Sequence, residues 1–182
     1  MVMDLDDLRR IGGAAKQSAF RLETLPQYLA PGEEADFSAW KAGEPLPPRT
    51  VENNELLAQI QRDAARGFRR YRVHILDQPL TAYLRFELYS YLERVAAGSE
   101  IYVVDRDDHP DLTDLHEDFW LFDDEIAVRM IYDDEGNFLY PERIDDIEPC
   151  CEVRDTALHH AELLTDYLTR KGFTPETLRI TR

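Results

Sequence analysis

The sequence predicts an α/β protein, with a mixed sheet of about five strands flanked by helices and preceded by an N-terminal helical arm. Residues 71–104 give the main indication, because they read as strand, turn, helix, glycine stop and strand, which is one βαβ unit. Residues 119–140 give the second, because short apolar runs separated by acidic turns are typical of antiparallel strands. The sheet should therefore contain both parallel and antiparallel pairs.

The composition is that of a globular chain with an acidic surface. Of the 182 residues, 43% are hydrophobic and 32% are charged, which excludes wholesale disorder. The formal net charge of -16 argues against direct binding to a nucleic-acid backbone, because phosphates require Lys and Arg. An acidic surface that serves solubility is the favoured explanation of this charge, and a basic partner is the alternative.

Residues 1–49 form the predicted N-terminal arm and its connector. Residues 3–15 carry apolar side chains at helical spacing, and residues 18–25 alternate apolar and polar side chains as in a short half-buried strand or an extended arm. A second short helix is expected over residues 31–40. The proline-rich residues 44–49 predict a stiff connector, and hence a boundary before an α/β domain of residues 50–182.

The predicted βαβ unit follows a helix expected over residues 51–68. Its strands are expected over residues 70–76 and 101–104, and its helix over residues 80–95. Gly98 comes shortly after that helix, where glycine favours a helix end.

The helix of this unit has two apolar faces. One stripe runs from Leu80 to Val95, yet Phe86 and Tyr89 fall on the opposite side, where a surface helix should be polar. Such a helix is either sandwiched between two layers or exposes one face to a partner.

The C-terminal part of the sequence predicts a meander and one long helix. A polar loop over residues 105–117 precedes a hairpin whose turn is Asp123-Asp124-Glu125. The three expected strands cover residues 119–124, 125–132 and 138–140. A single helix is expected over residues 150–171, ended by Gly172, to cover one face of the sheet.

Nothing in the sequence indicates export, membrane insertion or a cofactor. The two cysteines, Cys150 and Cys151, are adjacent and provide no disulfide framework. A charged and apolar leader is absent, as is any run of about 18 apolar residues. We therefore expect a cytoplasmic protein that contacts no membrane and carries no cofactor, since no nucleotide or nucleophile signature occurs.

The acidic loop is the first candidate site. Asp107, His109, Asp111 and His116 offer oxygen and imidazole ligands that suit several divalent cations. The loop lacks the Gly and Glu positions of an EF-hand and the spacing of a zinc site. A solvated acidic loop is therefore favoured, and no metal is predicted.

The polar trio His74, Arg85 and Glu87 inside the βαβ unit is the second candidate site. Functional residues collect at strand ends and helix starts of α/β units. No glycine-rich turn follows the first strand, so this turn is not a phosphate-binding loop. An ion pair that orients the helix is favoured over a catalytic role.

Three phrases carry a resemblance to a known family: SAFRLETLPQY at residues 18–28, QPLTAYLRFE at residues 78–87 and DFWLFDD at residues 118–124. They resemble an actinobacterial family of small proteins of unknown function, often encoded beside Xre-type helix-turn-helix regulators. The resemblance spans residues 18–168; it implies a regulatory or partner-binding role and supplies no catalytic residues. The sheet region also resembles half of a phospholipase D-like domain, but the His-x-Lys-x4-Asp signature is missing, which argues against phosphodiester hydrolysis.

We predict a non-catalytic cytoplasmic protein that binds another protein, either a helix-turn-helix transcription regulator or a second copy of itself. The residues expected to bind the partner are Phe86 and Tyr89 on the second helix face and Trp120 in an aromatic strand.

Two alternatives to this prediction remain open. One is an enzyme that depends on a small molecule or a metal and uses the trio of His74, Arg85 and Glu87, or else the loop between Asp107 and His116. The other is an acidic DNA mimic, which ranks last because basic residues are interspersed with the acidic ones.

Overall fold

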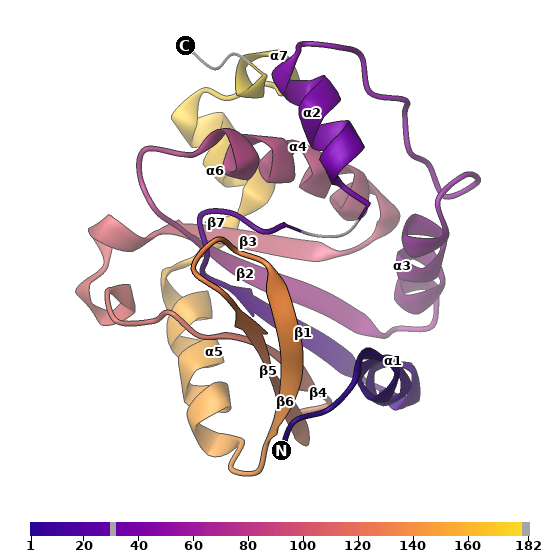
Figure 1. The fold of residues 1–182 in the computed structure, drawn as a ribbon, viewed down its shortest axis with the longest axis vertical. Helices are drawn as coiled ribbons and strands as arrows, with labels where there is room; N and C mark the ends of the chain where they lie inside the picture. Colours follow the sequence, from indigo (N-terminus) through magenta and orange to yellow (C-terminus); the bar gives the residue numbers. More distant parts are fainter. Residues whose placement is uncertain (30–31, 180–182) are drawn as a thin grey trace.

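Within residues 1–29 and 32–179, which the computed structural model of the protein describes, seven strands form one mixed sheet (Figure 1). The strand order is β6-β5-β4-β1-β2-β3-β7. The strands are β1 (Ser18–Glu23), β2 (Arg69–Leu76), β3 (Glu100–Asp105), β4 (Asp118–Phe122), β5 (Ile126–Tyr132), β6 (Phe138–Ile144) and β7 (Glu162–Leu163). The α-helices are α1 (Leu5–Ala14), α2 (Glu34–Lys41), α3 (Glu55–Ala65), α4 (Ala82–Ala97), α5 (Glu148–His160), α6 (Leu164–Lys171) and α7 (Pro175–Leu178).

The predicted βαβ unit is confirmed as β2, α4 and β3, with β2 and β3 parallel and adjacent. The helix α4 begins at Thr81, whose hydroxyl accepts a hydrogen bond from the Leu84 N–H at 3.0 Å. It ends at Gly98, where φ is 113° and a Cβ atom would lie 2.8 Å from the Cβ of Ala64. Only glycine fits both the backbone angle and that close approach.

The strand β1 lies in the middle of the sheet, although the sequence predicted only a half-buried strand or an arm. It pairs in parallel with β2 and in antiparallel with β4. Its polar side chains, Arg21 and Glu23, are only 3% and 8% exposed. The expected N-terminal arm is thus matched roughly, by α1, and β1 joins the segments on both sides of the proline-rich connector in one sheet.

The hairpin of β4 and β5 is confirmed, but the prediction of one long C-terminal helix is wrong. Ala161 leaves the helical conformation, and the short strand β7 separates α5 from α6. β7 pairs in antiparallel with β3 and so supplies hydrogen-bond partners to the edge of that strand. A helical pattern of apolar residues cannot reveal such an interruption, because β7 is only two residues long.

Helices cover the two faces of the sheet unequally. On one face, α5 packs against side chains of the central strands, including Phe20, Leu22, Val73 and Phe119. On the other, α1, α4 and α6 contribute to the core, with α2 and α7 packed outside α4. Figure 1 shows α2, α4, α6 and α7 grouped together, with α5 apart from them. Every helix in residues 1–29 and 32–179 is too short or too polar to pass through a lipid bilayer.

The second apolar face of α4 is covered by α2, which corrects the expectation that it is exposed to a partner. Phe86 is 2% exposed, and its ring centroid lies 5.4 Å from that of Phe37 and 5.8 Å from that of Trp40. The Tyr89 ring centroid lies 4.8 Å from that of Trp40. The helix α2 begins at Glu34; Pro31, which was expected to open it, lies outside the described residues.

Candidate functional site

A row of charged and polar side chains crosses the middle of the sheet on the face beneath α4. The strand register places Arg21 beside Arg72 and Glu23 beside His74, while Asp118 begins the antiparallel neighbour β4. Alternate residues of a strand share one face, so these side chains gather at the carboxyl end of β1. From β1 the chain continues to β2 on one side and later returns to β4 on the other, the position at which α/β sheets bind ligands.

Arg21 is held by carboxylates of two strands. Its Nη2 donates to Asp118 Oδ2 at 2.7 Å and to the Tyr132 hydroxyl at 3.1 Å. Its Nε donates to Glu23 Oε1 at 3.5 Å. Burial opposes the charge of Arg21, but the Asp118 carboxylate raises the pKa of the guanidinium, which stays cationic. Arg21 Nη1 is buried and has no hydrogen-bond partner in residues 1–29 and 32–179.

Glu23 accepts charge-assisted hydrogen bonds from the other side. Its Oε2 accepts from Arg72 Nη1 at 2.6 Å and from the Tyr91 hydroxyl at 2.6 Å. The same hydroxyl lies 3.0 Å from His74 Nδ1. Burial acts to raise the pKa of Glu23, but the charges of Arg72 and then Arg21 hold it below its usual range. Glu23 is therefore ionised, and its charge is balanced within the sheet.

Asp118 is saturated with hydrogen bonds. Its Oδ1 accepts from the Thr24 N–H at 2.9 Å and the Thr24 hydroxyl at 2.8 Å. Its Oδ2 accepts from Tyr28 at 2.6 Å in addition to Arg21. Burial raises the pKa of Tyr28 well above its usual value, so the phenol keeps its proton and remains a donor. Asp118 therefore ties β4 to the segment that follows β1.

Glu87 on α4 is a buried carboxyl group with one oxygen that lacks such a partner. The residue is 7% exposed, and its Oε2 has no hydrogen-bond partner in the described part of the chain. Burial, and then the charge of Glu23, raise the pKa of Glu87. It stands one helical turn before Tyr91 and one turn after Tyr83, whose hydroxyl donates to Glu33 Oε2 at 3.3 Å.

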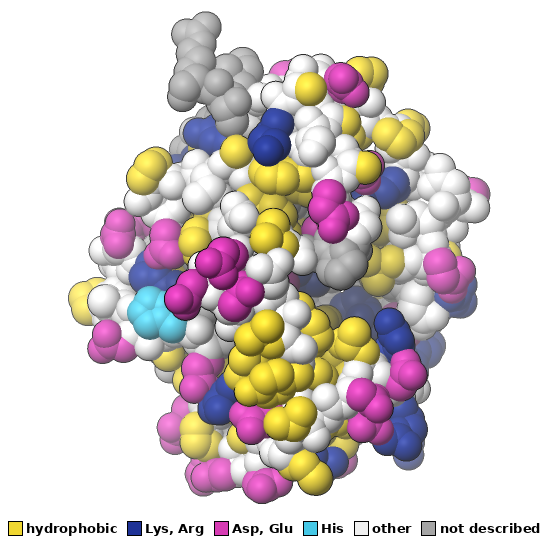
Figure 2. Space-filling model, in the orientation of Figure 1, with side chains coloured by type: hydrophobic (Ala, Val, Ile, Leu, Met, Phe, Trp, Pro, Cys, Tyr) yellow, Lys and Arg dark blue, Asp and Glu magenta, His cyan; other side chains and the backbone are white. Residues whose placement is uncertain are grey.

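These side chains line a cavity of about 360 Å³, which we call the charged cavity. Its lining comprises three cationic residues (Arg21, Arg72, Arg94), three carboxylates (Glu23, Glu33, Glu87), five aromatic residues (Tyr28, Tyr83, Trp120, Tyr132, Phe138) and three aliphatic residues (Leu5, Leu29, Met130). Leu5 and Leu29 are 42% and 36% exposed, so the cavity meets the surface beside them. Figure 2 shows Lys or Arg side chains recessed in a hollow next to the apolar patch over β6. This volume lies within the range of about 300–1,000 Å³ for small-molecule sites.

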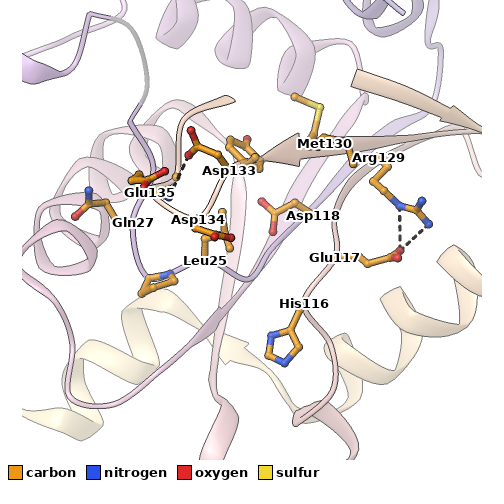
Figure 3. A pocket seen from close by; sticks show the side chains of 14 residues that line it. Leu25, Gln27, His116, Glu117, Asp118, Arg129, Met130, Asp133, Asp134 and Glu135 are labelled. Carbon is orange, nitrogen blue, oxygen red and sulfur yellow. Dashed lines mark hydrogen bonds and ion pairs between the residues drawn. The ribbon is translucent and has the colours of Figure 1, made fainter. Parts of the chain in front are cut away.

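A second, acidic cavity of about 590 Å³ is lined by Asp118 and by the turn that follows β5 (Figure 3). Figure 3 shows Asp118, Asp133, Asp134 and Glu135 turned toward this space, with Glu117 paired to Arg129. The carboxylate of Asp133 accepts from backbone N–H groups of its own turn, and Asp118 is saturated. Asp118 and Asp133 therefore have structural roles. No group of three or more His, Cys, Asp or Glu in residues 1–29 and 32–179 is placed to hold a metal ion.

The structure brings together two members of the predicted polar trio. His74 belongs to the hydrogen-bond network through Tyr91, and Glu87 lines the charged cavity. Arg85 does not join them, because residues two apart on a helix point in different directions. Its guanidinium carbon lies 5.3 Å from the ring centroid of Phe173 instead.

Trp120, expected as a partner-binding residue, is half-buried and lines the charged cavity. The Arg21 guanidinium carbon lies 5.6 Å from the centroid of its ring. This contact places an aromatic wall beside the Arg21 guanidinium.

The residues of the predicted acidic loop are scattered. His109 stacks on His160 with 4.3 Å between ring centroids, and Asp111 Oδ2 lies 3.3 Å from His160 Nε2. His116 lines the acidic cavity, and Asp107 is exposed. The four side chains therefore form no common site.

Sequence reasoning missed Arg21, Glu23, Arg72 and Asp118 as site residues. Their signal was the alternation of charged side chains in strands that pair with one another, as in Arg21-Leu22-Glu23. Such alternation normally marks a solvent face, and only the central position of β1 makes it a buried site.

A comparison with known families finds a match that covers most of the chain. The family described as Domain of unknown function (DUF6879) matches residues 6–169. No curated protein matches the chain. The matched range contains all the residues that line the charged cavity except Leu5.

Proposed function

Because the chain belongs to the DUF6879 family, whose description names no activity, we propose a function from the geometry of the site: the protein binds a small organic molecule in the charged cavity. This proposal replaces the predicted enzyme trio of His74, Arg85 and Glu87 by a binding site that Arg21, Arg72 and Glu87 share.

One observation carries the proposal. Arg21 Nη1 and Glu87 Oε2 are both buried without a hydrogen-bond partner among the described residues, and both side chains line the same cavity. A buried polar group left without a partner costs about 1–3 kcal/mol, so folded proteins rarely keep two of them together. A ligand that supplies partners to both atoms recovers that free energy on binding.

Binding is favoured over catalysis because of how the remaining charged groups are engaged. Glu23 and Asp118 are neutralised by guanidinium groups and hydroxyl donors. His74 is committed to Tyr91 and to the backbone oxygen of Leu25 at 3.3 Å. A general base needs a free acceptor within reach of its substrate, and these groups have none.

A thermal-shift screen tests the proposal. A fragment library of small carboxylates, amines and zwitterions should contain compounds that raise the unfolding midpoint, because a ligand of the native state stabilises it by mass action. The shift produced by amines and zwitterions should disappear in Glu87→Gln and persist in Glu93→Gln. Glu93 is a suitable control because it lies on the same helix but accepts from Arg49 Nε at 2.7 Å, away from the cavity.

Two outcomes count against the proposal. Amines and zwitterions that stabilise wild type and Glu87→Gln equally bind somewhere else. A library that stabilises neither protein leaves the charged cavity without a ligand of the proposed kind.

A second candidate function is the protein interaction expected from the sequence, with a helix-turn-helix regulator or a second copy as partner. It is favoured by an apolar patch over the edge strand β6 (Figure 2), where Val2, Leu139 and Tyr140 are 63%, 52% and 38% exposed. Leu139→Lys should then abolish self-association or regulator binding in sedimentation experiments without changing the fold. Unchanged sedimentation in the variant contradicts this candidate.

A further inference from the structure

The chemistry of the unpaired atoms narrows the class of ligand. Arg21 Nη1 is a donor and calls for an anionic or carbonyl oxygen. Glu87 Oε2 belongs to a carboxyl group, and the carboxylates of Glu23 and Glu33 line the same cavity. This acidic side calls for a donor, and a positively charged amine satisfies it best.

The two unpaired groups belong to one network rather than to separate sites. Arg21 contacts Glu23 through Nε, and Glu23 accepts from the Tyr91 hydroxyl at 2.6 Å. Glu87 lies one turn before Tyr91 on α4. Both groups line the one charged cavity, so a single ligand bound between them would have its anionic end toward β1 and its cationic end toward α4.

The remaining walls indicate the body of the ligand. Trp120, Tyr132, Tyr28 and Phe138 line the cavity, and their flat faces favour an aromatic or planar apolar group. The Tyr28 and Tyr132 ring centroids are 5.2 Å apart at 70°, so these rings already pack edge to face as a preformed wall.

We propose that the ligand is a small zwitterion with an aromatic body, an aromatic amino acid or a close relative, whose carboxylate binds Arg21 and whose ammonium group binds Glu87. This inference rests on the proposed binding function and deepens it. The ligand needs both charged ends. A simple carboxylate leaves Glu87 Oε2 without a partner, and a simple amine leaves Arg21 Nη1 without one.

Three probes with the same phenyl ring distinguish a zwitterionic ligand from a simple amine or a simple carboxylate. They are L-phenylalanine, 2-phenylethylamine and 3-phenylpropanoate. In calorimetric titrations of the full chain, we expect L-phenylalanine to bind at least about tenfold more tightly than either analogue, the effect of one charge-assisted hydrogen bond. An amine or a carboxylate that binds as tightly as the amino acid overturns the inference.

Two variants test whether Glu87 binds the cationic end of the ligand. Glu87→Gln should weaken L-phenylalanine at least about tenfold and leave 3-phenylpropanoate unchanged, since only the ammonium contact loses its charge. Glu93→Gln should bind all three probes as wild type does. An equal loss of both probes in Glu87→Gln contradicts the assigned orientation.

The failure of this inference is distinguishable from failure of the proposed function. If all three probes are silent while other fragments give thermal shifts that depend on Glu87, the zwitterion class is wrong and the binding function stands. If no fragment gives such a shift, both the zwitterion inference and the proposed binding function are wrong.

Discussion

Arg21 shows how one residue can serve the fold and the site together. Its Nη2 and Nε hold Asp118, Tyr132 and Glu23, while Nη1 has no partner within residues 1–29 and 32–179. A buried ion pair contributes little net stability, but removing one partner leaves the other charge buried and uncompensated. The guanidinium is thus fixed in place by the fold, and in the proposed complex its remaining N–H groups bind the ligand.

The Asp118–Arg21 pair should therefore be sensitive to truncation of either partner. We expect Asp118→Ala to lower the free energy of unfolding by about 3–5 kcal/mol, because Arg21, Thr24 and Tyr28 lose their common acceptor. The neighbouring Glu117 is 63% exposed at its side chain and pairs with Arg129 at 3.0 Å. Glu117→Ala should cost at most about 1 kcal/mol, and urea unfolding of both variants measures the contrast. Equal losses of unfolding free energy in the two variants would show that the Asp118–Arg21 pair is exposed to solvent.

The raised pKa of Glu87 predicts how the stability of the fold depends on pH. Its pKa in the folded protein is raised by burial and by Glu23 above the ordinary value of 4.5, so the folded state holds its proton more tightly than the unfolded state. The resulting stabilisation is complete below pH 4.5 and is lost as pH rises through the folded-state pKa. The groups around it are Glu23, Arg72 and His74 on the sheet and Arg94 on its own helix.

Glu87→Gln removes this titration and keeps the shape of the side chain. Relative to wild type, the variant should gain stability as pH rises from 4.5 toward neutrality. Urea unfolding of both proteins at several pH values measures the difference. A difference that stays constant over this range means that Glu87 is solvated and titrates alike in both states.

At the scale of elements, α4 is the helix on which both the core and the site depend. One face carries Tyr83, Glu87 and Tyr91 toward the charged sheet, while Phe86 packs under α2. Sequence periodicity predicted the helix and both apolar faces, because these follow from residue spacing alone. It could not decide between a layer of the same chain and a partner, because α2 has only eight residues and gives a weak pattern of its own.

The stability of a Phe86 variant distinguishes a helix α4 that α2 covers from one that is exposed to a partner. Phe86→Ala should destabilise the chain by about 3–5 kcal/mol, because it empties a site packed by Phe37 and Trp40. Leu139→Ala, at a residue 52% exposed on β6, should stay within about 0.5 kcal/mol of wild type. Chemical denaturation of both variants tests this. A Phe86→Ala loss as small as that of Leu139→Ala would mean that α2 does not cover α4 in solution.

At the scale of the whole molecule, local sequence patterns predicted most helices and strands but not which strands pair with one another in the sheet. The βαβ unit and the β4–β5 hairpin follow from turns, glycine stops and alternation within short stretches. The central place of β1 depends on pairing with β2 and β4, which lie about 50 and 100 residues further along the chain. The site is made by that pairing, so His74 and Glu87 were predicted while Arg21, Glu23 and Asp118 were not.

The central claim is that the charged cavity is a ligand site, and the indole signals of the two tryptophans test it directly. Trp120 lines the cavity, whereas Trp40 belongs to α2, is 1% exposed and packs against Phe86 and Tyr89 of α4, away from the cavity. In ¹H–¹⁵N correlation spectra recorded during titration with L-phenylalanine and the stabilising fragments, the Trp120 indole signal should move and that of Trp40 should stay, with Trp120→Phe giving the assignment. A stationary Trp120 signal at concentrations that raise the unfolding midpoint would contradict the account.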